Sequence, residues 1–301
     1  MRTKTNPRDK AVALTFDIED YFQVENLRGH FPLETWENVP MRLEKPTMDI
    51  LDLLDKYGFK GTFFVLGWTA LKVPGLVKEI DKRGHEIASH GYSHKLNNNG
   101  NLSNEELRKD LSESKEILEQ ITGKKVYGYR APSFSVSDDV LGCIQGTGYS
   151  YDSSLFPFKG NKKYGSVSGK TICSLETHYS FREFGIPVLD ILGLKLPFAG
   201  GAYFRLLPLW SIEWATKSSS KDILVFYFHP WEFDPLQPTI KGLSLSKKIR
   251  HYWGLGRNLK KLSDFLSFIQ SSEMQVAPLK EIGMNFREQE VGNSKERLTV
   301  Y

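Results

Sequence analysis

Short apolar runs alternate with amphipathic segments along most of this 301-residue chain. Runs rich in β-branched and aromatic residues predict buried strands, and apolar residues at helical spacing predict the helices between them. The expected strands include residues 11–16, 59–66, 86–89 and 223–228, and the expected helices include residues 48–57, 76–83 and 138–145 and a capped helix between Ser103 and Gly123. Because this strand-then-helix unit repeats about seven times, we expect an α/β fold whose parallel strands form a (β/α) barrel.

The barrel is expected to form a single domain over residues 1–284, because no internal repeat or linker divides this part of the chain. Hydrophobic residues make up 40% of the sequence, which is enough for one full core. The remaining residues, 285–301, are rich in Glu, Arg and Lys and are interpreted as a charged C-terminal tail.

The charge balance and the apolar segments limit the partners and the location that we expect. The 40 basic and 36 acidic residues leave a net charge of only +4, which gives no general attraction to nucleic acid. No apolar stretch follows the basic N-terminus, and no segment is apolar over the length that a membrane span requires. We therefore expect a cytoplasmic protein with no membrane span and no nucleic-acid partner.

Chemically capable side chains follow five of the predicted strands directly. They are Asp17, His90, Arg130, Asp152 and His229. In a parallel barrel the carboxyl ends of all strands lie on one face, where active sites are built. The sequence therefore predicts that these side chains converge on one site.

Two motifs at these strand ends favour a metal site. His90 and His94 lie four residues apart in SHGYSH, and two imidazoles at this spacing can bind one divalent ion together with a carboxylate. The segment FDIED supplies the carboxylates of Asp17, Glu19 and Asp20. Taken singly, the histidines could be solvated loop residues and the acids a helix cap or surface turn. Together they form a ligand set and a spare base, and zinc is the expected metal.

Two further strand ends supply groups that could assist a hydrolysis. Arg130, in GYRAPSF, could keep Asp17 ionised and oriented through a charge-assisted hydrogen bond. His229 follows the apolar run ILVFYF and precedes a proline. It could be a core histidine, but its place at the rim favours a general acid, because imidazole titrates near neutral pH.

The motifs TFDIED, ASHGYSH, YRAPSFS, YDSSLFP and VFYFHPWE resemble, in order, those of the polysaccharide deacetylases, the NodB-homology group of carbohydrate esterase family 4. The resemblance covers roughly residues 11–280 and implies a distorted (β/α) barrel with a metal bound by Asp-His-His. It also implies a base from the first motif and a histidine acid from the last. His90 and His94 match the metal histidines, Arg130 the arginine that orients the base, and His229 the acid. Asp152 lies where the family often has a residue that tunes this acid.

The first motif departs from the family's usual pair of adjacent aspartates, since it reads Asp17-Ile18-Glu19-Asp20. This form resembles the branch that includes the Helicobacter-type peptidoglycan deacetylases and the metal-independent allantoinase-like enzymes. Side chains alternate along an extended strand, so Glu19 should point the same way as Asp17. We therefore assign Asp17 as the base and Glu19 as the third metal ligand, with Asp20 as the reserve ligand.

The resemblance implies a metal-dependent hydrolase that removes the N-acetyl group of a sugar in a polysaccharide or a lipid-linked saccharide, for example in exopolysaccharide biosynthesis. A hydrolase of a small cyclic amide or ureide is the main alternative, although both metal histidines are retained. A glycan-binding module without catalysis is disfavoured because the base, ligands and acid are intact. A glycosidase would need two carboxylates on opposite sides of a sugar cleft, whereas the first motif groups its acids on one side.

Overall fold

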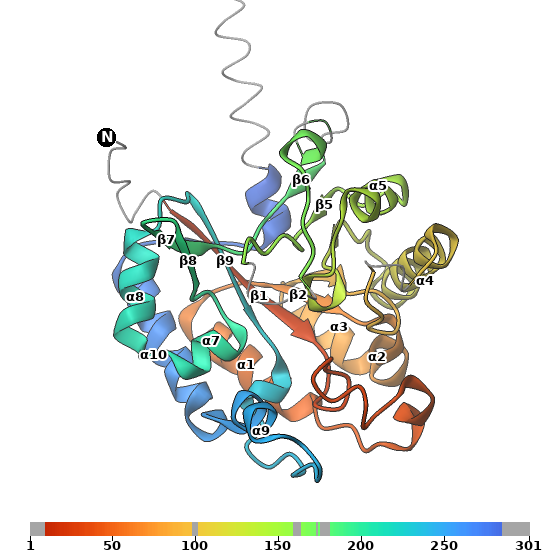
Figure 1. Ribbon diagram of the computed structural model, residues 1–301, viewed down its shortest axis with the longest axis horizontal. Helices are drawn as coiled ribbons and strands as arrows, with labels where there is room; N and C mark the ends of the chain where they lie inside the picture. The colour runs from red at the N-terminus through yellow and green to blue at the C-terminus, as the bar shows by residue number, and fades with distance from the viewer. Residues whose placement is uncertain (1–9, 98–101, 159–163, 173, 175–180, 285–301) are drawn as a thin grey trace, which may run out of the picture.

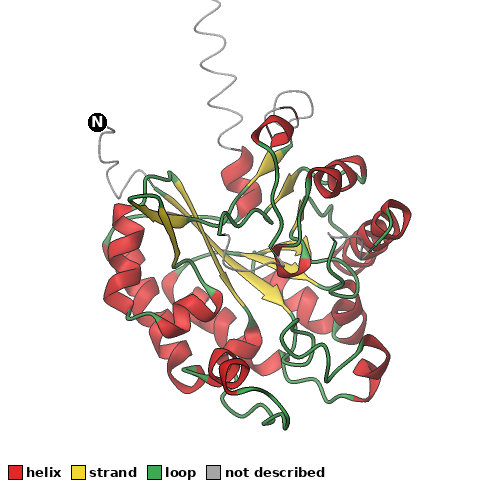
Figure 2. Ribbon diagram, viewed as in Figure 1, coloured by secondary structure: helices red, strands yellow, loops and turns green. Residues whose placement is uncertain are grey.

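The structure is a computed structural model that describes residues 10–97, 102–158, 164–172, 174 and 181–284 (Figure 1). Its strands lie at the centre of the molecule, and its helices surround them (Figure 2). The predicted C-terminal tail, residues 285–301, lies outside the described residues.

The central strands form one parallel sheet. Its members are β1 (Ala11–Ile18), β2 (Thr62–Val65), β3 (Glu86–Ser89), β4 (Gly128–Tyr129), β5 (Tyr151–Asp152), β6 (Arg182–Glu183), β9 (Ile223–Phe228) and β10 (Gln275–Val276). The order is β9-β1-β2-β3-β4-β5-β6, and all of these pairs are parallel. β10 and β2 pair with the same edge of β1, β10 with its first residues and β2 with its last. These two strands therefore occupy one position in the sheet order. No described strand joins β6 to β9, so strand pairing does not close the barrel at this point. The predicted distorted barrel of about seven parallel strands is confirmed.

Helices cover the outside of this sheet. They are α1 (Glu44–Tyr57), α2 (Gly67–Lys72), α3 (Pro74–Lys82), α4 (Asn104–Thr122), α5 (Asp138–Gly146), α7 (Gly201–Leu206), α8 (Leu209–Ser218), α9 (Leu245–Tyr252) and α10 (Leu255–Ser271). Short 3-10 turns add η2 (Leu33–Asn38), η3 (Pro132–Phe134) and η4 (Pro230–Phe233). No helix in the described part of the chain is long and apolar enough to cross a bilayer.

Local signals in the sequence explain where several helices begin and end. α1 ends at Gly58, which takes a φ of 68° that favours glycine. α4 begins at a capping box, in which the Ser103 hydroxyl accepts from the backbone of Glu106 and the Glu106 carboxylate accepts from the backbone of Ser103. It ends at Gly123, again with a positive φ of 67°.

Residues 188–197 form a hairpin that the sequence did not predict. β7 (Val188–Ile191) pairs antiparallel with β8 (Leu194–Pro197), outside the parallel sheet. The turn is made by Leu192 and Gly193, which both have positive φ values, and the Leu192 side chain is fully exposed. The hairpin therefore adds to the surface and does not contribute a barrel strand.

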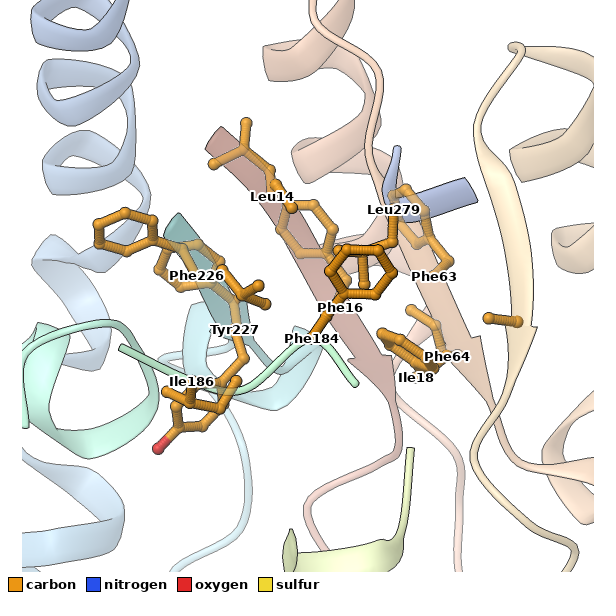
Figure 3. Packing of buried hydrophobic residues seen from close by; sticks show 14 of the residues in the cluster. Leu14, Phe16, Ile18, Phe63, Phe64, Phe184, Ile186, Phe226, Tyr227 and Leu279 are labelled. Atoms are coloured by element: carbon orange, nitrogen blue, oxygen red, sulfur yellow. The ribbon is translucent and has the colours of Figure 1, made fainter. Parts of the chain in front are cut away.

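Aromatic packing aligns the strands that carry the site. Phe16 of β1 stacks on Phe63 of β2, with ring centroids 4.8 Å apart (Figure 3). It also stacks on Phe228 of β9, with ring centroids 5.7 Å apart. In the strand register Phe16 lies directly opposite both of these residues. Burial of these rings removes a large apolar area from water and fixes the three strands side by side. Asp17 and His229, the next residues along β1 and β9, are thereby neighbours.

The fold generates one prediction about acid stability, which concerns His85. Its ring is buried, and its Nδ1 accepts a hydrogen bond from the backbone of Gly61, so the ring is held neutral. Burial, assisted by the nearby Lys60 ammonium, lowers the pKa of His85 to about 4. The unfolded chain, with a pKa near 6.5, binds one more proton between these values, so stability falls as the pH falls through this window. Lowering the pH from 7 to 5 should therefore reduce the free energy of unfolding by about 2 kcal/mol through His85.

Urea unfolding of the wild type and of His85→Asn at both pH values measures this contribution. The asparagine oxygen can still accept from Gly61 but does not titrate, so the variant should lose about 2 kcal/mol less than the wild type on acidification. Equal losses in the two proteins would contradict a neutral buried His85.

Candidate active site

The carboxyl ends of the central strands open into one cavity of about 160 Å³. Asp17 and Glu19 reach it from the end of β1, His90 and His94 from the end of β3, and His229 from the end of β9. The residues that the motifs singled out thus come together from segments far apart in the sequence. Aromatic rings form part of the remaining wall, namely Phe134, Tyr164, Tyr227 and Trp231.

Glu19, His90 and His94 form a cluster that fits a divalent cation. Each offers one ligand atom, these atoms lie within 4.8 Å of one another, and all three residues are buried. Glu19 Oε2 lies 2.9 Å from His94 Nε2 but has no hydrogen-bond partner. A carboxylate oxygen and an imidazole nitrogen at this separation suit a shared divalent ion, since tetrahedral zinc ligands lie about 3.3 Å apart.

The protonation states of this cluster also suit a cation. His90 Nδ1 donates to the carbonyl oxygen of Arg130 at 2.9 Å, which leaves Nε2 with a free lone pair. Burial lowers the pKa of His90 to about 4, so the ring is neutral at pH 7. Burial alone would raise the pKa of Glu19, but the imidazoles of His94, His229 and His90 lower it to about 2. An ionised carboxylate and a neutral imidazole are the forms that bind metals.

Arg130 holds Asp17 in place from beneath the cavity. Its guanidinium is fully buried and donates to Asp17 Oδ1 at 2.7 Å and to Thr15 Oγ1 at 2.8 Å. The other side of the guanidinium donates to the backbone oxygen and hydroxyl of Ser153, and its plane lies 4.1 Å from the Phe64 ring centroid. Arg130 thus occupies Oδ1 of Asp17. The other carboxylate oxygen, Oδ2, faces the cavity.

His229 is held by a chain of buried charges. Its Nδ1 donates to Glu232 Oε2 at 2.9 Å, and its Nε2 lies 3.2 Å from Glu19 Oε1 and 3.8 Å from Asp17 Oδ2. Burial alone would lower the pKa of His229, but the carboxylates of Glu232, Glu19 and Asp17 raise it to about 9. The ring therefore carries a donatable proton at neutral pH.

Glu232 and Arg205 are site residues that the sequence analysis missed. Arg205 Nε donates to Glu232 Oε1 at 2.8 Å, and both side chains are almost completely buried. The three-residue spacing of His229 and Glu232 in HPWE was a usable local signal. Arg205 comes from α7, and no motif links it to this site.

The structure corrects the role expected for Asp152. Its carboxylate accepts from the backbone and hydroxyl of Ser154 and shares a hydrogen bond with the Glu183 carboxyl. Burial, followed by the neighbouring carboxylate, raises the pKa of Glu183 well above its usual value, so this pair holds a proton. Among the described residues, the carboxylates that contact His229 are those of Glu232, Glu19 and Asp17, and Asp152 makes no direct contact with this histidine.

The carboxylate of Asp20, the reserve ligand, lies outside the Glu19–His90–His94 cluster. Its carboxylate accepts from the backbone N–H groups of Tyr21, Arg42 and Leu43. Burial raises the pKa of Asp20 to about 6, against the lowering effect of these hydrogen bonds. Asp20 thus ties the chain after β1 to the segment before α1, whereas Glu19 faces the histidines.

Two family models match the chain. Residues 4–151 match the model described as polysaccharide deacetylase, and residues 153–277 match a domain of unknown function, DUF3473.

Among curated proteins, a peptidoglycan-N-acetylglucosamine deacetylase of Bacillus cereus is 34% identical over 103 residues, covering 34% of this chain and 47% of that protein. A peptidoglycan deacetylase of Helicobacter pylori is 32% identical over 106 residues, covering 35% of this chain and 36% of that protein. The chain thus spans less than half the length of these relatives.

Solved structures share the fold. A putative polysaccharide deacetylase from Mycobacterium smegmatis superposes with a TM-score of 0.59 at 23% identity, over 96% of this chain and 94% of that one. A peptidoglycan deacetylase from Bacillus subtilis gives a TM-score of 0.51 at 18% identity, over 97% and 99%. At these identities the likeness concerns the fold alone. Residues 4–151, which carry the Glu19–His90–His94 cluster and the Asp17–Arg130 pair, thus match the polysaccharide deacetylase family.

Proposed function

We propose that this chain hydrolyses the N-acetyl amide of an N-acetylated sugar, in a polysaccharide or a lipid-linked saccharide, and releases acetate. The observation that carries this proposal is the convergence of three units on one cavity: the Glu19–His90–His94 cluster, the Asp17–Arg130 pair and the His229–Glu232 pair. The relatives named as peptidoglycan-N-acetylglucosamine deacetylases support the substrate class.

Glu19, His90 and His94 would hold a divalent cation, and we propose zinc because neutral imidazoles with one carboxylate suit this ion. Such a cation supplies Lewis acidity, which activates water and polarises the acetamide carbonyl. The remaining steps belong to side chains of this chain.

Asp17 and His229 divide the proton transfers. Asp17 accepts the proton of the attacking water, since the charge-assisted hydrogen bond from Arg130 fixes the orientation of its carboxylate. His229 donates its Nε2 proton to the sugar nitrogen as the carbon–nitrogen bond breaks, which yields a free amine and acetate. Glu232 is a positioning residue, because it accepts from Nδ1 of His229 and so directs Nε2 at the reacting atoms.

The cavity wall supports a sugar as the substrate. Trp231, Tyr227 and Phe134 line the cavity beside the proton-transfer groups. Flat aromatic faces pack against the apolar faces of sugar rings, while their polar edges hydrogen-bond hydroxyl groups. The particular sugar is left to experiment, and the cytoplasmic location expected from the sequence stays a prediction.

The first test concerns the metal ligands. The wild-type chain should bind one divalent ion, and Glu19→Gln should weaken this binding at least tenfold, because the ligand loses its charge. Asp20→Asn is the matched control, since this neighbouring acid bonds only backbone groups among the described residues. Calorimetric titration with zinc, together with elemental analysis of the purified proteins, measures both. Loss of metal in Asp20→Asn with retention in Glu19→Gln would reverse the assignment.

The second test concerns catalysis. His229→Ala should lower acetate release from N-acetylglucosamine oligosaccharides by about a hundred- to ten-thousandfold, the usual contribution of a general acid. Asp17→Asn should lower it to a similar extent, and both variants should keep the metal. His30→Ala, at an exposed histidine outside the site, is the control and should react at the wild-type rate. Wild-type turnover in His229→Ala would remove the acid from the mechanism.

A further inference from the structure

Helix α9 exposes its apolar side to solvent. Leu245 and Ile249, one turn apart, and Trp253, which directly follows the helix, are 73%, 45% and 58% exposed. His251, on the opposite side of the helix, is only 1% exposed. A surface helix normally packs its apolar side on the core. Here the polar residue packs on the core, and Leu245, Ile249 and Trp253 form an apolar stripe that faces outward.

Basic residues border this apolar stripe. At 100° per residue, Lys248 and Arg250 lie on either side of it, and Lys247 is exposed further round the helix. None of these three side chains forms an ion pair with another described residue. No acidic residue occurs between Asp234 and Asp264, while this segment holds seven lysines and arginines: Lys241, Lys247, Lys248, Arg250, Arg257, Lys260 and Lys261.

The orientation of α9 is fixed by hydrogen bonds to neighbouring segments. The Arg205 guanidinium donates to the carbonyl oxygens of Arg250, His251 and Trp253. The ring of His251 donates to Gln237 at 2.7 Å and stacks on Trp231 at 4.5 Å. The exposure of the apolar stripe therefore belongs to a helix that is anchored in the fold.

α9 also forms part of the cavity wall. Arg250 and His251 line the cavity of the candidate active site, while the apolar stripe lies on the far side of the same helix. A surface that bound the stripe would therefore come to lie beside the cavity.

We propose that α9 docks this protein on an anionic lipid bilayer. The apolar stripe would enter the boundary between headgroups and acyl chains, where tryptophan is favoured, and the flanking basic side chains would contact lipid phosphates. A second copy of this chain fits less well, because a symmetric contact would bring two basic clusters together. A nucleic acid would contact the lysine and arginine side chains but would leave the apolar stripe exposed. The proposal goes beyond the proposed hydrolysis and does not rest on it.

Vesicle co-sedimentation of the full chain, without metal or glycan, tests the docking. Binding to vesicles of equal parts phosphatidylglycerol and phosphatidylcholine should be at least tenfold tighter than binding to phosphatidylcholine alone. The triple variant Leu245→Gln, Ile249→Gln, Trp253→Gln should bind the anionic vesicles at least tenfold more weakly than the wild type. The double variant Lys247→Glu, Lys248→Glu should also lose at least tenfold, and added salt should weaken the wild type.

The β7–β8 hairpin supplies the matched control, because Ile191, Leu192 and Leu194 are 40%, 103% and 62% exposed and lie far from α9 (Figure 1). Replacing these three by glutamine should leave vesicle binding unchanged. Thermal unfolding checks that every variant is folded. Wild-type binding by the α9 triple variant would overturn the proposal. So would a wild-type dimer in light scattering that the α9 variant abolishes, since a second copy would then cover the stripe.

Discussion

The buried guanidinium of Arg130 joins the parts of this site. It donates to Thr15 and Asp17 at the end of β1 and to Ser153 after β5, while the carbonyl of the same residue accepts from His90. Removing a charge this completely from water is costly unless its donors are matched, and the Arg130 guanidinium has acceptors on β1 and directly after β5. The orientation of Asp17 and of His90 therefore depends on a single residue that is completely buried.

Asp17 and Glu19 are two residues apart on the same side of one chain, yet their surroundings give them different chemistry. Asp17 faces a guanidinium, which occupies one of its oxygens and leaves the other near His229. Glu19 faces imidazoles, with Oε2 at 2.9 Å from His94 Nε2 and Oε1 at 3.2 Å from His229 Nε2. The two carboxylates thus have different surroundings, which suit Asp17 to the proton transfer and Glu19 to the metal binding proposed above.

The strands Glu86–Ser89 and Ile223–Phe228 and the capped helix Asn104–Thr122 could be predicted residue by residue, because apolar runs and caps act locally. The convergence of Asp17, His90 and His229 could be predicted from topology, since parallel strands end on one face. Contacts between segments that lie far apart in the sequence could not be predicted. Glu183 lies on a two-residue strand with no sequence pattern, so its pairing with Asp152 was invisible, and Arg205 reaches Glu232 from a separate helix.

β1 is paired on both sides, and this has a consequence for how the chain can be divided. Its partner β2 lies within residues 4–151, whereas its partners β9 and β10 lie within residues 153–277, the segment matched by a separate family model. A fragment that stops between these segments would expose β1, a buried strand at the centre of the sheet, along one whole edge, which invites aggregation. It would also lack His229 and Glu232. The segments matched by the two family models thus share one sheet and line one cavity, so the second cannot be exchanged or lost as an independent module could.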